Sequence, residues 1–110
     1  MGYDLHVTRA EHWTKSASQE ISATEWGDAV FADPNLRPDS TNGPHAVLWL
    51  GPAGAVKGWF DWCAGAVYTT NPDRPLVAKM LELAGRLGGR VQGDQGEFYE
   101  TAEDWNSEAE

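Results

Sequence analysis

"HAVLWLGPAGAVKGWFDWCAGAVYTT", residues 45–70, is the stretch of sequence that decides the fold class. Its apolar segments are separated by two short turns that contain glycine, at residues 51–55 and 64–65. Turns of this length join neighbouring antiparallel strands in hairpins. The stretch therefore predicts a three-stranded antiparallel meander, with strands over residues 45–50, 56–63 and 66–70.

The middle strand of this meander carries four residues whose faces can be predicted. Successive side chains of a strand point to opposite faces, so Trp59 and Asp61 lie on one face and Phe60 and Trp62 on the other. We expect the second pair to face the core and the first pair to face outward with Lys57. A bulge at Gly58 would change this assignment.

The segment before the meander contains the clearest local signal for a helix, over residues 22–33. Ser22 and Glu25 have the spacing of a capping box, and Ile21 and Trp26 have that of a hydrophobic staple. Apolar residues then recur at helical spacing until a proline ends the run.

A second helix is predicted after the meander. It begins at Asp73, which can cap it, and ends at Gly88 or Gly89, which can adopt the left-handed conformation. Pro75 is tolerated in its first turn, where an N–H would have no partner. One apolar stripe is expected along it, formed by Leu76, Val77, Met80, Leu81, Ala84 and Leu87.

The remaining segments complete the fold prediction. Residues 3–10 alternate apolar and polar side chains, which indicates a half-buried strand, and residues 90–93 begin a last strand. The polar residues 11–20 and the proline-rich residues 34–44 are interpreted as loops. The order β-α-β-β-β-α-β predicts an α+β fold with both helices on one face of an antiparallel or mixed sheet. The other face is expected to stay partly open.

The negative charge of the chain is concentrated at its C-terminal end. The net charge is −9: residues 1–96 contain eleven acidic and eight basic residues, and residues 97–110 contain six acidic and no basic ones. We divide the chain into one domain over residues 1–99 and an acidic tail over residues 100–110. Nucleic acid is an improbable partner because phosphate binding needs a basic surface, whereas a basic protein would be attracted.

Composition also bears on location and chemistry. No run approaches 18 apolar residues, which predicts no membrane span, and the N-terminus has no signal-peptide pattern. A single cysteine, Cys63, excludes an internal disulfide, so we expect a cytoplasmic protein. Cys63 lacks any nucleophile motif and is interpreted as a small, half-buried strand residue. The three histidines, His6, His12 and His45, lack metal-ligand spacing, although His6 shares a strand face with Asp4. We predict no catalytic residue, cofactor or metal.

Two aromatic features indicate a binding surface. An outward Trp59 beside Asp61 has the character of an interface centre, unless the loop over residues 34–44 covers it. Near the C-terminus, Phe98, Ala102 and Trp105 recur at helical spacing, which would allow the segment to dock as a short helix. The predicted partner-binding residues are Trp59, Asp61, Asp94, Glu97, Glu100, Glu103, Asp104 and Trp105.

Both ends of the chain resemble a known set of proteins. "YDLHVTRAEHW" at residues 3–13, and "NPD" at 71–73 with "LVAKMLELAGRLGGRVQGDQGEFY" at 76–99, are similar to small, largely uncharacterised acidic bacterial proteins common in actinobacteria. These begin in the style Tyr-Asp-Leu-His-x-Thr-Arg-Ala. Some such proteins resemble immunity proteins that neutralise secreted toxins. The resemblance implies a bacterial cytosolic protein, and no catalytic residue carries over from it.

Three functions from different classes remain open, and we expect the first. The chain is a protein-binding module of the immunity type, whose carboxylates and exposed aromatic residues occlude a basic site on a toxin or enzyme. The first alternative is a small-molecule-binding protein or enzyme, with a pocket lined by Trp49, Trp62 and Tyr68 and with His6 or His45 as the polar group. The second alternative is a homo-oligomeric structural subunit whose open sheet face pairs with its own copy.

Overall fold

The structure, a computed structural model, describes residues 3–105. Within them the chain forms a seven-stranded sheet in the order β2-β3-β4-β5-β1-β6-β7. The strands are β1 (Asp4–Thr8), β2 (Leu36–Pro38), β3 (Val47–Leu50), β4 (Val56–Cys63), β5 (Ala66–Thr70), β6 (Arg90–Gly93) and β7 (Phe98–Tyr99). The helices are α1 (Ala23–Ala32) and α2 (Arg74–Leu87), with short 3₁₀ helices η1 (Trp13–Gln19), η2 (Ser40–Asn42), η3 (Pro52–Gly54) and η4 (Ala102–Asp104). The predicted α+β fold is confirmed.

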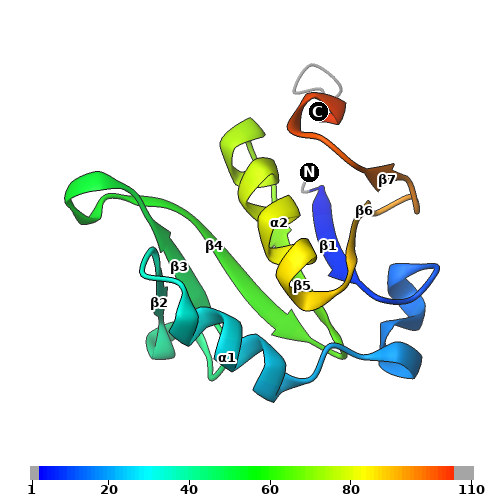
Figure 1. The fold of residues 1–110 in the computed structure, drawn as a ribbon, viewed down its shortest axis with the longest axis horizontal. Coiled ribbons are helices and arrows are strands. Elements are labelled where there is room, and N and C mark those ends of the chain that lie inside the picture. The colour runs from blue at the N-terminus through cyan, green and yellow to red at the C-terminus, as the bar shows by residue number, and fades with distance from the viewer. Residues whose placement is uncertain (1–2, 106–110) are drawn as a thin grey trace.

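The N-terminal strand β1 lies inside the sheet, between β5 and β6. Both neighbours are antiparallel to β1 and therefore run parallel to each other, and α2 connects them across one face of the sheet (Figure 1). The predicted meander forms β3, β4 and β5. The first half of β4 pairs with β3 and its second half with β5, so this long strand joins the two parts of the sheet.

Both helices begin and end where the sequence indicates. The Ser22 side chain accepts a hydrogen bond from the Glu25 N–H, and the Glu25 carboxylate accepts one from the Ser22 N–H, which completes the predicted capping box of α1. Asp73 caps α2, and Gly88 ends it in the left-handed conformation. The buried stripe of α2 includes Leu83, which the sequence analysis missed, whereas Leu81 is only half-buried.

The core lies between the sheet and the two helices. Its largest fully buried side chains include Trp26 from α1, Phe60 from β4 and Met80 from α2. Apolar residues of β1, β5 and β6 complete it, namely Leu5, Val7, Val67 and Val91. A buried ion pair also joins the helices, because Lys79 Nζ of α2 lies 2.5 Å from the carboxylate of Asp33, which caps the C-terminal end of α1.

The two segments interpreted as loops contain secondary structure. Residues 11–20 include η1, which packs against β1 and β5 on the sheet face turned away from α2. The Ser16 hydroxyl lies 2.7 Å from that of Thr8, and the Trp13 ring stacks on His6 at a centroid distance of 4.0 Å. Residues 34–44 include η2 and the edge strand β2, whose short length and terminal proline conceal it in the sequence.

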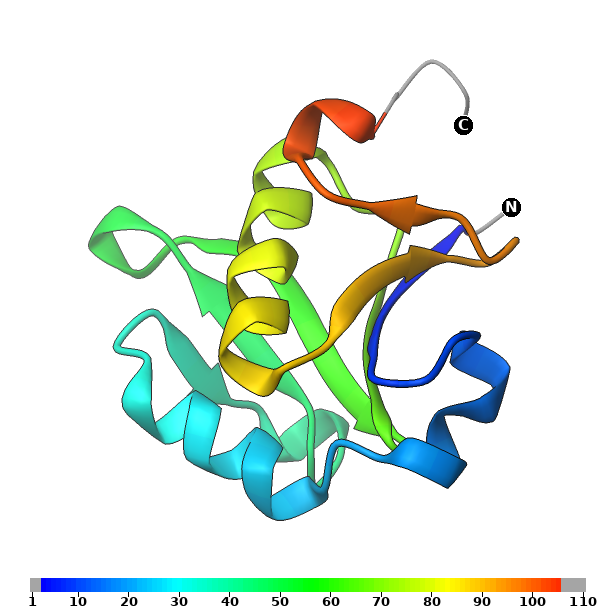
Figure 2. The ribbon, with the colours of Figure 1, turned by 45° about the vertical axis from the view of Figure 1, so that its right-hand side comes forward.

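The C-terminal segment belongs to the folded domain. Figure 2 shows η4 beside the N-terminal end of α2, and Arg74 of that helix donates a hydrogen bond to the Trp105 carbonyl. The Trp105 side chain is only 3% exposed and belongs to the core. Residues 100–105, assigned from the sequence to the acidic tail, therefore pack on the domain as far as Trp105. Residues 106–110 of the predicted tail lie outside the described residues.

Candidate functional site

Two adjacent hollows lie on the sheet face that is turned away from α2, and Tyr68 of β5 lines both. The first, of about 300 Å³, lies between η1 and β5, and the second, of about 360 Å³, lies between η2 and β4. The first is lined by Asp4, His6, Trp13, Thr14, Ser16, Ala17, Cys63, Ala64, Ala66 and Tyr68. The second is lined by Asp39, Asn42, Ala46, Val47, Leu48, Trp59, Asp61 and Tyr68.

Strand register brings the key side chains of this surface together. Asp61 of β4 pairs with Tyr68 of β5, which in turn pairs with His6 of β1, so the three side chains follow one another across the same face. Trp59, two residues before Asp61, packs edge-on against the Tyr68 ring at 5.8 Å between centroids. Trp59 is 39% exposed, so the prediction of an outward Trp59 beside Asp61 is confirmed.

The sequence allowed for a bulge at Gly58. The structure has a bulge in β4 one residue earlier, at Lys57. Pairing between β3 and β4 shifts from Trp49–Gly58 to Leu50–Val56, so the bulge leaves the alternation from Trp59 onward intact. Lys57, expected outward with Trp59 and Asp61, instead extends over the Trp49 ring, with Nζ 5.4 Å from the ring centroid.

The surface around Tyr68 carries negative charge. None of the described residues that line the two hollows is a lysine or arginine. Burial raises the pKa of the Tyr68 hydroxyl, and the nearby acidic groups of Asp61, Cys63 and Asp4 raise it further. Acidic groups from β4 and β1 therefore act on one phenol, which places a negative potential at the junction of the hollows. Arg37 lies opposite Leu48 on the edge strand β2, outside both hollows.

Asp4, His6 and Asp94 form a polar cluster at one end of this surface. Their ligand atoms all lie within 4.8 Å of one another, so this cluster could hold a metal ion. Each group already has a partner within the protein. His6 Nε2 lies 3.0 Å from one Asp94 oxygen, the Asp4 N–H donates to the other, and Asp4 accepts from the Thr70 hydroxyl. These contacts link β1 to the turn after β6, which gives the cluster a structural role.

The predicted partner-binding residues divide into separate groups. Trp59 and Asp61 lie at the second hollow, and Asp94 belongs to the polar cluster beside the first. The other four acidic residues are exposed in the segment from the turn before β7 to η4, and are Glu97, Glu100, Glu103 and Asp104.

Trp105, predicted to be an exposed anchor, is buried instead. Its ring packs against Tyr3 and Tyr99, with centroids 5.9 and 6.0 Å away. Glu97 accepts hydrogen bonds from both tyrosine hydroxyls. Burial and this carboxylate raise the pKa of Tyr3 to about 12. Part of the acidic segment thus serves to hold the C-terminal end on the domain.

The alternative small-molecule pocket is not formed as predicted. Trp49 and Trp62 pack against the core, whereas Tyr68 faces the opposite side of the sheet, so the three do not line one cavity. His45 contacts the edge of Trp62, with centroids 4.9 Å apart. Cys63, expected to be half-buried, is exposed on the rim of the first hollow.

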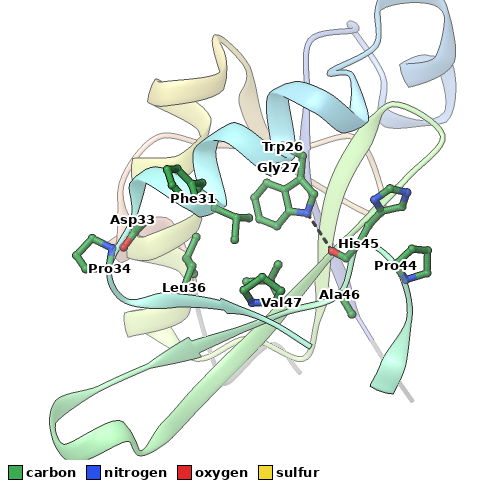
Figure 3. Close-up of a pocket in the computed structure, with 12 residues that line it drawn as sticks. Trp26, Gly27, Phe31, Asp33, Pro34, Leu36, Pro44, His45, Ala46 and Val47 are labelled. Carbon is green, nitrogen blue, oxygen red and sulfur yellow. Dashed lines mark hydrogen bonds between the residues drawn. The ribbon is translucent and has the colours of Figure 1, made fainter. Parts of the chain in front are cut away.

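A third hollow, which the sequence analysis missed, lies between α1 and the β2–β3 edge of the sheet (Figure 3). Its volume is about 440 Å³. Trp26 forms its inner wall, held by a hydrogen bond from its indole N–H to the His45 carbonyl at 3.0 Å, and Leu36 and Val47 face it from the strands. All three prolines of residues 34–44 line it, namely Pro34, Pro38 and Pro44, but in the sequence they indicate only a loop.

Comparison of the chain with protein-family models, with curated proteins and with solved structures found no match. Among the described residues, no helix combines the length and the apolar character that crossing a membrane requires.

Proposed function

We propose that this protein is a protein-binding module that binds a basic protein through the face around Trp59, Asp61 and Tyr68, in the manner of an immunity-type inhibitor. The observation that carries the proposal is the combination, on one face, of an exposed indole, carboxylates from several elements and hollows without a basic lining residue. Large aromatic side chains that pack in hollows dominate the energy of many protein interfaces.

The charge arrangement supports a basic partner over a neutral one. Asp4 of β1, Asp61 of β4 and Asp39, the residue before η2, line the two hollows. An arginine or lysine of the partner would find carboxylate acceptors there, together with the ring faces of Trp59 and Tyr68 for cation–π contact. With a net charge of −9, the whole molecule would also accelerate encounter with a basic protein. An active site or nucleic-acid-binding groove on such a partner would be blocked by the bound domain.

The test begins with capture of the partner from a lysate of the cells that produce the protein, followed by measurement of the dissociation constant at several salt concentrations. We expect a basic protein whose affinity falls as salt rises, because screening weakens charge complementarity. We also expect its enzymatic activity to be inhibited at a one-to-one ratio. An affinity that is indifferent to salt would refute the electrostatic part of the proposal.

Matched variants locate the binding face. Asp61→Asn and Glu103→Gln each remove one negative charge, but only Asp61 lines a hollow. Trp59→Ala and Phe98→Ala each remove an aromatic side chain of similar exposure, 39% and 36%. We expect Trp59→Ala and Asp61→Asn each to weaken binding at least about tenfold, with little effect from the two controls. If the controls weaken binding and the other two do not, the partner binds the C-terminal acidic segment instead.

A further inference from the structure

The hollow between α1 and the β2–β3 edge has a protruding apolar side chain on its own rim. Phe31 of α1 lines this hollow and is 93% exposed, the highest exposure of any large apolar side chain in the described part of the chain. Figure 3 shows Phe31 beside the hollow whose walls include Trp26, Leu36 and Val47. A bulky apolar group and an apolar hollow thus occur side by side on one patch, which we call the α1 patch.

The hollow presents no unpaired charge, in contrast to the acidic surface around Tyr68. Its titratable lining residues are Asp33 and His45. Asp33 is buried and forms ion pairs with Lys79 at 2.5 Å and Arg86 at 3.3 Å. Because the chain carries a net charge of −9, two copies repel each other over most approaches. The lining of the hollow itself adds no unpaired negative charge to such a contact, and the exposed Asp28 of α1 lies outside that lining.

We propose that the α1 patch is a self-association surface, where Phe31 of each copy inserts into the hollow of the other. A twofold interface is isologous: residue i of one copy contacts residue j of the second, and j of the first contacts i of the second. Such an interface needs both the protruding group and the receiving hollow on one patch, and the α1 patch has both. A foreign partner would need only one of them. This proposal is independent of partner binding on the face around Trp59.

Two substitutions test the two halves of the contact separately without changing the net charge. Phe31→Ala removes the protruding ring and leaves the hollow intact. Gly27→Gln places a side chain at the hollow, which Gly27 lines, and leaves Phe31 intact. A Cβ at Gly27 would have no atom within 4 Å, so the fold tolerates this change. Thermal unfolding of both variants, expected to match or exceed that of the unchanged protein, verifies this.

The experiment measures self-association by sedimentation equilibrium up to about 1 mM protein. We expect the unchanged protein to form dimers as concentration rises, and each variant to associate roughly 100-fold more weakly, since each loses both of the reciprocal contacts. The decisive measurement is the binding of one variant to the other. Phe31→Ala, labelled at the exposed Cys63, is titrated with Gly27→Gln, and fluorescence anisotropy follows binding.

Mixing should restore part of the association, because one intact ring then meets one intact hollow. Heterodimer affinity between that of the unchanged protein and that of either variant alone supports the proposal. Three results would overturn it: a protein that stays monomeric up to about 1 mM, dimers that persist in both variants, or variants that lose association without partial recovery on mixing.

Discussion

Replacing Lys79 with methionine should lower the free energy of unfolding by about 3 kcal/mol at neutral pH. The Lys79 ammonium and the Asp33 carboxylate are both buried and lie 2.5 Å apart. Methionine fills a similar volume but leaves the carboxylate without its main partner. Loss of one partner of a buried pair costs about 3–5 kcal/mol. We expect the lower end because Arg86 remains 3.3 Å from the same oxygen.

The pH dependence of the variant follows from the pKa of Asp33. Burial acts to raise this pKa, but hydrogen bonds from Lys79 and the Asn35 N–H, with the charges of Lys79 and Arg86, bring it below its ordinary value. A lowered folded-state pKa contributes stability that is present above the unfolded pKa and is lost as pH falls through the folded value. In Lys79→Met, burial should dominate and raise the pKa. The variant should then regain stability as pH falls through that raised pKa.

Urea unfolding of both proteins between pH 7 and about pH 4 measures these effects. The difference in the free energy of unfolding between the unchanged protein and Lys79→Met should become smaller as the pH falls. Glu82→Gln is the control, because Glu82 is an exposed partner of the same ammonium at 3.2 Å and its loss should cost less than about 1 kcal/mol. A loss below about 1 kcal/mol for Lys79→Met, or a difference that stays constant with pH, would refute this reasoning.

Three other substitutions test separate parts of the fold. Ser22→Ala removes the N-cap of α1 and should cost about 1 kcal/mol, seen as a lower urea midpoint. Gly27→Ala should add up to about 1 kcal/mol, because the site is helical and the added methyl group meets no other atom; a lower melting temperature would contradict this. Trp105→Ala should cost about 3–5 kcal/mol in chemical unfolding, because the ring lies in the core. A Trp105→Ala variant as stable as the unchanged protein would show that the C-terminal segment is dispensable for folding.

The candidate site was predicted in part, through alternation along one strand. Phe60 and Trp62 face the core and Trp59 and Asp61 face outward, as strict alternation requires. The wall formed by η1 could not be predicted, because its polar residues carry no helical periodicity. They are held by distant partners: the Gln92 side chain of β6 accepts from the Trp13 N–H and donates to the Glu11 carbonyl.

Local sequence by itself determined the meander and the limits of both helices. The capping box of α1, the Asp73 cap and Gly88 each act within a few residues, and so does the alternation of β4. Such signals depend on backbone geometry between near neighbours, which the order of residues alone specifies.

Only the tertiary structure decided which apolar residues are buried and which remain on the surface. Trp105 looked like an exposed anchor, but Tyr3, at the other end of the chain, encloses it in the core. Phe31 lies on a helix that buries Trp26 and Val30, and it is left exposed on the rim of a hollow closed by β2 and β3. Burial is a property of contacts between segments far apart in the chain, and the hydrophobicity of one residue does not reveal which surface will meet it.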